Sequence, residues 1–475
     1  MNESENLPRS LTDLAGALRE RRLSPVEVVG TLLESIETVD EELNAFVTVL
    51  RTEALEEAVR AEREIITGKY RGPLHGVPIA LKDLIYTRSV RTTMGSAFFE
   101  DHIPDDNATV ASKLEEAGAI FIGKANTHEF AYGPTGDRSH FGPTRNPHDL
   151  NRIPGGSSGG SGAAVAAGLC YAALGSDTAA SVRVPAALCG VVGMKPTFGR
   201  VSKKGVFPLA WTLDHVGPLT RTVEDNALLL NALAGHDPKD PYSVDRPAED
   251  FTRDLGRPIR SGVVGVPASF YFEHVEDEVG QRVREAIEVL RSLGAEVREV
   301  EIPNLQEALK AQRYILATEA YAIHEERLKS EPERFGDEVR ERLLDGESLK
   351  AHRYATAQQV TKRRSLEEFE HALREADVLL TPTVSIAATE IGQRKVNIGG
   401  YEEYVFSALT RLTGPTNLNG LPSLSVPCGL TRSGLPVGLQ LIGRPFDEAT
   451  LYRYGHAYEA AALMEAETAQ EEPLA

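Results

Sequence analysis

Short apolar segments alternate with helical segments along most of this chain. After Gly72, strand-like stretches such as 77–81 and 119–122 are separated by helical stretches such as 108–116, and glycine or proline residues end them. This alternation is typical of an α/β fold, in which helices pack on a β-sheet. Of the 475 residues, 41% are hydrophobic and 25% are charged, as in ordinary globular proteins. We therefore predict a soluble α/β protein with a large core.

The segments that flank this alternation have a different character. Residues 1–68 are mostly helical and include a capping box at Ser24 and Glu27. Residues 237–376 contain long charged helices, expected at 276–293, 305–328 and 365–375, and one strand candidate at 263–266. Strand-like stretches return at 378–380, 423–426 and 438–442. We predict one domain over 1–475, built from an N-terminal helical layer (1–68), a catalytic core (69–236), a helical excursion (237–376) and a part that completes the sheet and ends in a C-terminal helix (377–475).

The net charge and the spacing of the cysteines argue against several classes of partner. The chain has 51 basic and 70 acidic residues, a net charge of −19, which disfavours binding to nucleic acid and to anionic membranes. Cys170, Cys189 and Cys428 lack the close spacing of a zinc site and are expected to be buried reduced thiols.

The polar start of the chain does not resemble a signal peptide. The apolar run 162–175 is shorter than the roughly 20 residues that cross a bilayer, so we expect a buried helix there and a cytoplasmic protein.

The most unusual stretch is a Gly/Ser-rich run at 154–162 that leads directly into the apolar run 163–167. A flexible linker would be expected to lead into a polar segment instead. A phosphate loop would end in Gly-Lys-Ser/Thr, which is missing here. The run also contains Gly-x-Ser-x-Gly around Ser157, but the nucleophile elbow of α/β hydrolases needs a strand immediately before it. The preceding residues 145–154 are polar and are interrupted by proline, so a serine site of another kind is favoured.

A second serine, Ser181, follows Ser157 after 24 residues and precedes the Arg-x-Pro of residues 183–185. Upstream, residues 76–83 read Gly-Val-Pro-Ile-Ala-Leu-Lys-Asp. With these three motifs the sequence resembles the amidase signature family. The match continues through 123–126, 141–147, 190–197, 217–218 and 434–440, and so covers about residues 24 to 460. The resemblance implies a large mixed β-sheet core covered by helices on both faces.

The resemblance also implies a catalytic triad: Ser181 as the nucleophile, Ser157 as a bridging serine with a cis peptide, and Lys82 as the base. A serine hydroxyl must lose its proton as it attacks, and a lysine accepts that proton only when neutral. The pKa of Lys82 must therefore fall by roughly three units from about 10.4, and burial beside Ile79 and Leu81 could supply this fall. Ser157 would relay the proton between the base and the nucleophile.

Further roles follow from the same resemblance. The backbone N–H groups of an oxyanion hole are expected at Thr178, Ala179, Ala180 and Ser181. Many relatives carry two glycines where this chain has Ala179 and Ala180, and the added methyl groups narrow the space beside the nucleophile. Ser158, Asp177 and Arg183 match positions that hold the loops around the site. The mechanism needs no metal and no cofactor, and the histidines near the motifs are expected to be structural: His75, His128, His140 and His215.

Within this family, stand-alone hydrolases differ from the A subunit of glutamyl-tRNA amidotransferase. Several stretches are similar to that subunit, but Val184 replaces its usual glutamine, and residues 407–417 lack its acidic character. We therefore predict a stand-alone amidase for small-molecule amides, esters or carbamates, with a homodimer left open. The alternatives are a noncatalytic scaffold and the amidotransferase subunit. The candidate substrate pocket consists of Tyr132, Val184, Phe207, Leu209 and Trp211.

Overall fold

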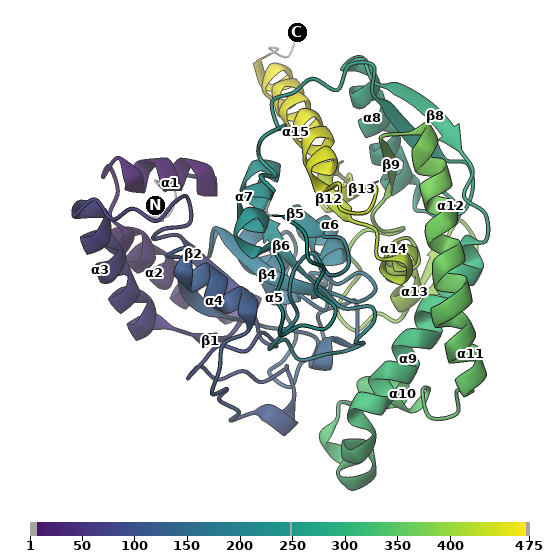
Figure 1. The fold of residues 1–475 in the computed structure, drawn as a ribbon, viewed down its shortest axis with the longest axis horizontal. Helices are drawn as coiled ribbons and strands as arrows, with labels where there is room; N and C mark the ends of the chain where they lie inside the picture. The colour runs from purple at the N-terminus through teal and green to yellow at the C-terminus, as the bar shows by residue number, and fades with distance from the viewer. Residues whose placement is uncertain (1–6, 248, 472–475) are drawn as a thin grey trace.

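The molecule is built around one mixed β-sheet, and the computed structural model describes residues 7–247 and 249–471 (Figure 1). Eleven strands form this sheet in the order β1-β3-β2-β4-β6-β5-β12-β13-β9-β7-β8. In chain order they are β1 (Phe46–Val49), β2 (Pro78–Lys82), β3 (Ile120–Ala125), β4 (Ala172–Asp177), β5 (Val192–Lys195), β6 (His215–Thr220), β7 (Val263–Pro267), β8 (Glu296–Val300), β9 (Val378–Pro382), β12 (Ser423–Leu430) and β13 (Pro436–Ile442). β2 is parallel to β3 and β4, whereas β6, β12 and β13 make antiparallel pairs. The predicted α/β class with a large mixed sheet is confirmed.

Helices flank the sheet, with the N-terminal helices at one end of the molecule and α9 to α12 at the other (Figure 1). Their bounds are α1 (Leu11–Arg19), α2 (Pro25–Leu43), α3 (Arg51–Ile66), α4 (Thr109–Glu116), α5 (Gly159–Ala166), α6 (Arg183–Cys189), α7 (Val223–Leu233), α8 (Asp277–Ser292), α9 (Leu305–Ser330), α10 (Asp337–Leu344), α11 (Ala351–Thr356), α12 (Lys362–Glu375), α13 (Val405–Thr410), α14 (Gly414–Asn419) and α15 (Glu448–Glu471). A separate hairpin consists of β10 (Lys395–Ile398) and β11 (Tyr401–Tyr404). No helix in the described ranges combines the length and the apolar character needed to span a bilayer.

Local sequence signals explain several of these elements. The capping box of α2 is present, because the Ser24 side chain accepts from the N–H of Glu27 while the Glu27 side chain accepts from the N–H of Ser24. Strands β2, β3, β4 and β13 are buried along their whole length, as expected for central strands covered on both faces. The three cysteines are buried and unpaired, which confirms that they are internal thiols.

The small residues of α5 allow the backbone of this helix to approach its neighbours closely. A Cβ atom added to Gly160 would lie 2.3 Å from the Ala45 carbonyl oxygen and 2.4 Å from the Asn126 nitrogen. A Cβ atom on Gly162 would lie 2.9 Å from the Cβ of Pro185. The Gly/Ser run is therefore a packing element of the core and not a flexible linker.

Two sequence predictions about secondary structure were wrong. Residues 162–175 do not form one buried helix, because α5 ends at Ala166 and Gly168 takes a left-handed conformation (φ +73°) before β4 begins. The excursion contains a second strand, β8, parallel to β7 at the edge of the sheet. Its sequence, EVREV, is largely exposed, so a charged edge strand lacked the apolar signal that identified β7. The domain boundaries at 68, 236 and 376 stay predictions.

Candidate active site

Lys82 is the last residue of β2, and its side chain is fully buried. Its Nζ atom donates to the Oγ of Ser157 at 2.6 Å and to the Oγ of Ser176 at 2.9 Å. Burial lowers the pKa of Lys82 from 10.5 to about 7, although the carboxylates of Asp177 and Asp214 act in the opposite direction. A considerable fraction of this lysine is therefore neutral near pH 7, as a general base requires.

Ser157 lies in the loop that precedes α5 and is also fully buried. The Gly156–Ser157 peptide bond is cis, as the resemblance implied. The carbonyl oxygen of Ser157 accepts from the N–H of His128 and from the hydroxyl of Thr127, both at 3.1 Å. These contacts hold the loop so that the hydroxyl of Ser157 meets Lys82.

Ser181 lies between β4 and α6 with 6% of its surface exposed. The N–H of Ser158 donates to the carbonyl oxygen of Ser181 at 3.3 Å, so the two serine loops are in contact. Among the described residues, no group forms a hydrogen bond with the hydroxyl of Ser181, and the hydroxyls of Ser157 and Ser181 are not bonded to each other. The Ser181 hydroxyl is thus free to meet a ligand.

Four consecutive backbone N–H groups have no protein acceptor in the described part of the chain. They belong to Thr178, Ala179, Ala180 and Ser181. Neither alanine is among the residues with positive φ. The methyl groups of Ala179 and Ala180 therefore carry no backbone penalty compared with glycine. Free N–H donors beside a serine hydroxyl are what an oxyanion hole requires.

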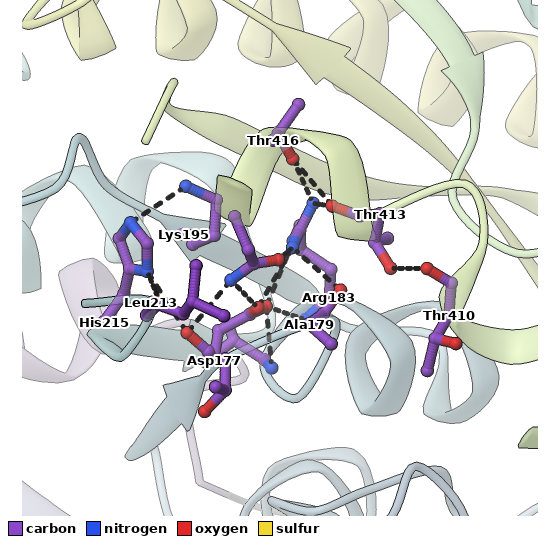
Figure 2. Close-up of polar contacts among 12 residues, drawn as sticks. Asp177, Ala179, Arg183, Lys195, Leu213, His215, Thr410, Thr413 and Thr416 are labelled. Carbon is purple, nitrogen blue, oxygen red and sulfur yellow. Dashed lines mark hydrogen bonds and ion pairs between the residues drawn. The ribbon is translucent and has the colours of Figure 1, made fainter. Parts of the chain in front are cut away.

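A buried ion pair supports this segment from behind (Figure 2). The guanidinium of Arg183 binds Asp177 through Nε and Nη2, each at 3.0 Å. Asn417 donates to the carboxylate and to the carbonyl oxygen of Asp177 at 2.9 and 3.1 Å. Burial alone would raise the pKa of Asp177, but the charge and hydrogen bonds of Arg183 hold it well below its usual value.

Ser158 and His215 lie next to this network, whereas His75 contacts Glu64 and His140 lies near Glu100, both away from it. The hydroxyl of Ser158 donates to the Ser176 carbonyl oxygen at 3.2 Å. The ring of His215 lies between the Leu213 carbonyl oxygen, 2.7 Å from Nδ1, and the Nζ of Lys195, 3.3 Å from Nε2 (Figure 2). Burial lowers the pKa of His215 well below its usual value, so this histidine is a neutral structural residue.

Four residues that the sequence did not single out also contact the site: Ser176, Asp214, Gln312 and Asn417. Ser176 shares Lys82 with Ser157, and Asp214 accepts from the Thr178 hydroxyl at 2.6 Å. Gln312 of α9 donates to the Thr178 carbonyl oxygen at 3.2 Å. Ser176 lies in the same small-residue segment as Ser181, which was the available signal. No local pattern marks Gln312 or Asn417, because each reaches the site from more than 100 residues away.

Three of the five predicted pocket residues line one cavity of about 220 Å³, which we call the Trp211 cavity. Its lining includes Ser176, Phe207, Leu209, Trp211, Asp214 and His215. Tyr132 is buried elsewhere, and its hydroxyl donates to the Arg342 carbonyl oxygen at 3.4 Å. Val184 is fully buried in an aliphatic cluster with Ala179 and Ala180. Since Val184 faces no open space, its replacement of a glutamine does not by itself argue against a polar substrate.

The chain is similar to known proteins over almost its whole length. A family model described as Amidase matches residues 27–452. The A subunit of the glutamyl-tRNA(Gln) amidotransferase from Geobacter sp. (strain M21) is 40% identical, over 95% of this chain and 96% of the relative. A solved structure from a vestigial protein complex, described as revealing the evolutionary origins of an s-triazine catabolic enzyme, has a TM-score of 0.91 at 33% identity, over 95% of this chain and 98% of that chain. A bacterial aryl acylamidase has a TM-score of 0.88 at 29% identity, over 98% and 99% of the two chains.

Proposed function

The chain belongs to the amidase family, and we propose that it cleaves the carbon–nitrogen bond of an amide through an acyl-enzyme on Ser181. The observation that carries this proposal is the contact between a buried lysine whose pKa is about 7 and the hydroxyl of Ser157. A neutral amine held against a serine hydroxyl can accept a proton at physiological pH. The free hydroxyl of Ser181 lies on the adjoining loop.

In the proposed reaction, the Oγ of Ser181 attacks the amide carbonyl carbon while its proton passes through Ser157 to Lys82. The negative charge that develops on the carbonyl oxygen is stabilised by the N–H groups of residues 178–181. The carbon–nitrogen bond then breaks, and the leaving amine takes the proton back through Ser157. Water attacks the acyl group in the same way and regenerates the free serine. Esters and carbamates present the same carbonyl to this machinery.

Two substrate classes compete. The relative from Geobacter is part of an amidotransferase, which favours a glutamine amidase that works with partner subunits over the stand-alone hydrolase predicted from the sequence. The Trp211 cavity favours the stand-alone hydrolase, because the ammonia released from glutamine needs no aromatic pocket. In either case the protein would act in the cytoplasm on a small-molecule amide.

Labelling and turnover together test the proposal. A fluorophosphonate should modify the wild-type chain at Ser181, as mapped by mass spectrometry, and should leave Ser181→Ala unlabelled. The same protein is then assayed on glutamine and on aryl and alkyl amides, alone and with candidate partner subunits. Glutaminase activity that exceeds every other amidase activity, or that needs partners, would establish the amidotransferase reading. Absence of both labelling and turnover would leave a noncatalytic scaffold.

A further inference from the structure

The Trp211 cavity joins the proposed base to the molecular surface. Ser176, which accepts a hydrogen bond from Lys82 at 2.9 Å, is part of its lining. The walls carry the flat side chains of Phe207, Trp211 and Tyr242, and 41% of the surface of Trp211 is exposed. Flat aromatic walls around a narrow space are suited to a planar apolar group. A group bound in this cavity would lie next to Ser176, on the side of the site where Lys82 is proposed to accept and return the proton.

Three lysines line the same cavity: Lys203, Lys204 and Lys239. The Nζ of Lys203 donates to the carbonyl oxygen of Trp211 at 2.7 Å and lies 4.3 Å from the centre of the Tyr242 ring. The Nζ of Lys204 donates to the carbonyl oxygen of Asn107 at 3.4 Å. Among the ion pairs of the described residues, none involves any of these three lysines. Asp214 and Asp240 line the cavity too, and the charges of both, with that of Glu319, act on Lys203. The three lysines outnumber the two carboxylates of the lining, so an anion bound here would meet a local excess of positive charge.

The nearby carboxylates are engaged by other donors. Asp214 accepts from the backbone N–H groups of Leu209 and Ala210, in addition to Thr178. Asp240 accepts from the backbone N–H groups of Lys203 and Tyr242, at 2.7 and 2.9 Å. Both carboxylates therefore have backbone donors, while their charges still act on Lys203.

A third carboxylate, that of Glu319 in α9, lies against the loop that contains Trp211 and Thr212. Glu319 of α9 accepts from the N–H and hydroxyl of Thr212 and from the hydroxyl of Tyr354. Lys362 donates to the Thr212 carbonyl oxygen at 3.0 Å. Glu319 thus receives these hydrogen bonds from neutral donors and forms no direct ion pair with Lys203 among the described residues, although its charge acts on that lysine.

We propose that the Trp211 cavity receives the leaving group, and that this group is an aromatic amine carrying a carboxylate. The inference rests on the proposed function and names its substrate class. The ring would lie between the aromatic walls, and the carboxylate would meet the lysines. When the carbon–nitrogen bond breaks, the Ser181 oxygen keeps the acyl group, and the arylamine nitrogen takes the proton from Ser157.

Protection of Ser181 from fluorophosphonate tests this inference without knowledge of the acyl group. We expect 4-aminobenzoate to slow the labelling of the wild-type chain at concentrations about tenfold lower than aniline does, because only the former carries an anion for the lysines. In Lys203→Met and Lys204→Met the advantage of 4-aminobenzoate over aniline should fall about tenfold. Lys310→Met is the matched control, because Lys310 is an exposed lysine of α9 outside the cavity, and it should keep the wild-type ratio.

A second measurement uses turnover. For substrates that share an acetyl group, kcat/KM should rank 4-acetamidobenzoate above acetanilide and acetanilide above acetamide, and Trp211→Ala should reduce the advantage of both aryl amides. Equal protection by 4-aminobenzoate and aniline, or no protection by either, overturns the inference even when Ser181 is labelled. Failure to label Ser181 at all would instead contradict the proposed function, so the two failures are distinguishable.

Discussion

The guanidinium of Arg183 donates hydrogen bonds to both carboxylate oxygens of Asp177, and neither side chain is exposed to solvent. The two residues lie at opposite ends of the segment 178–182, so their pairing closes the loop that holds the free N–H groups and Ser181. Arg183 also donates to Gln440 of β13 at 2.7 Å. The loop that carries Ser181 is therefore tied to the C-terminal half of the sheet.

Loss of this pair should destabilise the fold. In Arg183→Met the carboxylate of Asp177 remains buried without its countercharge, which typically costs about 3–5 kcal/mol in the free energy of unfolding. Urea denaturation followed by circular dichroism measures the change. Arg363→Met is the matched control, because Arg363 pairs with Glu367 on an exposed helix face and its loss should have no measurable effect. Similar midpoints for the two variants would contradict the structural role of Arg183.

The rate of acylation should rise with pH and then level off. Lys82 accepts a proton only when neutral, and its pKa of about 7 is well below the usual 10.5 because the side chain is buried. We expect the rate of labelling by fluorophosphonate to be half-maximal near pH 7. Lys82→Arg should react slowly at every pH, since arginine stays protonated. A wild-type rate that does not change with pH around 7 would exclude Lys82 as the base.

Substitutions of Ser181 and Ser157 should have different effects on turnover and on labelling. Ser181→Ala removes the atom that becomes acylated and should abolish both turnover and labelling, whereas Ser157→Ala keeps the nucleophile and should retain slow labelling. Because the residues act as one unit, the double variant Lys82→Ala with Ser157→Ala should be scarcely slower than the worse single variant. Label found on Ser157, together with turnover by Ser181→Ala, would reverse the assignment.

Ser176 should act as a positioning residue for Lys82. Its hydroxyl accepts a hydrogen bond from the lysine, which stabilises the charged form, so Ser176→Ala should shift the pH midpoint of labelling downward and reduce kcat/KM about tenfold. Ser176→Thr keeps a hydroxyl and should restore both quantities. A lowered rate with an unchanged midpoint would mean that the alanine only loosens the packing.

The sequence alone determined the fold class and pointed to the residues of the candidate site. Alternating strand and helix patterns and the capping box of α2 are short-range signals, because they depend on neighbours within a few residues. The motifs around Lys82, Ser157 and Ser181 were equally visible, since each motif is continuous along the chain. Charged strand β8 was missed because periodicity reports burial, and β8 is largely exposed.

The tertiary structure decided what these residues meet. Lys82 and Ser157 are 75 positions apart, and Arg183 and Gln440 are 257 apart, so only the sheet order brings them together. The pKa of Lys82 depends on complete burial, which comes from the elements packed around β2 and not from Ile79 and Leu81 alone. The same packing encloses Val184 and leaves Trp211 at the mouth of a cavity. Contact and desolvation depend on residues distant in the chain. For that physical reason the sequence could suggest Phe207, Leu209 and Trp211 as pocket residues, but only the tertiary structure showed that they share one cavity and that Tyr132 and Val184 lie outside it.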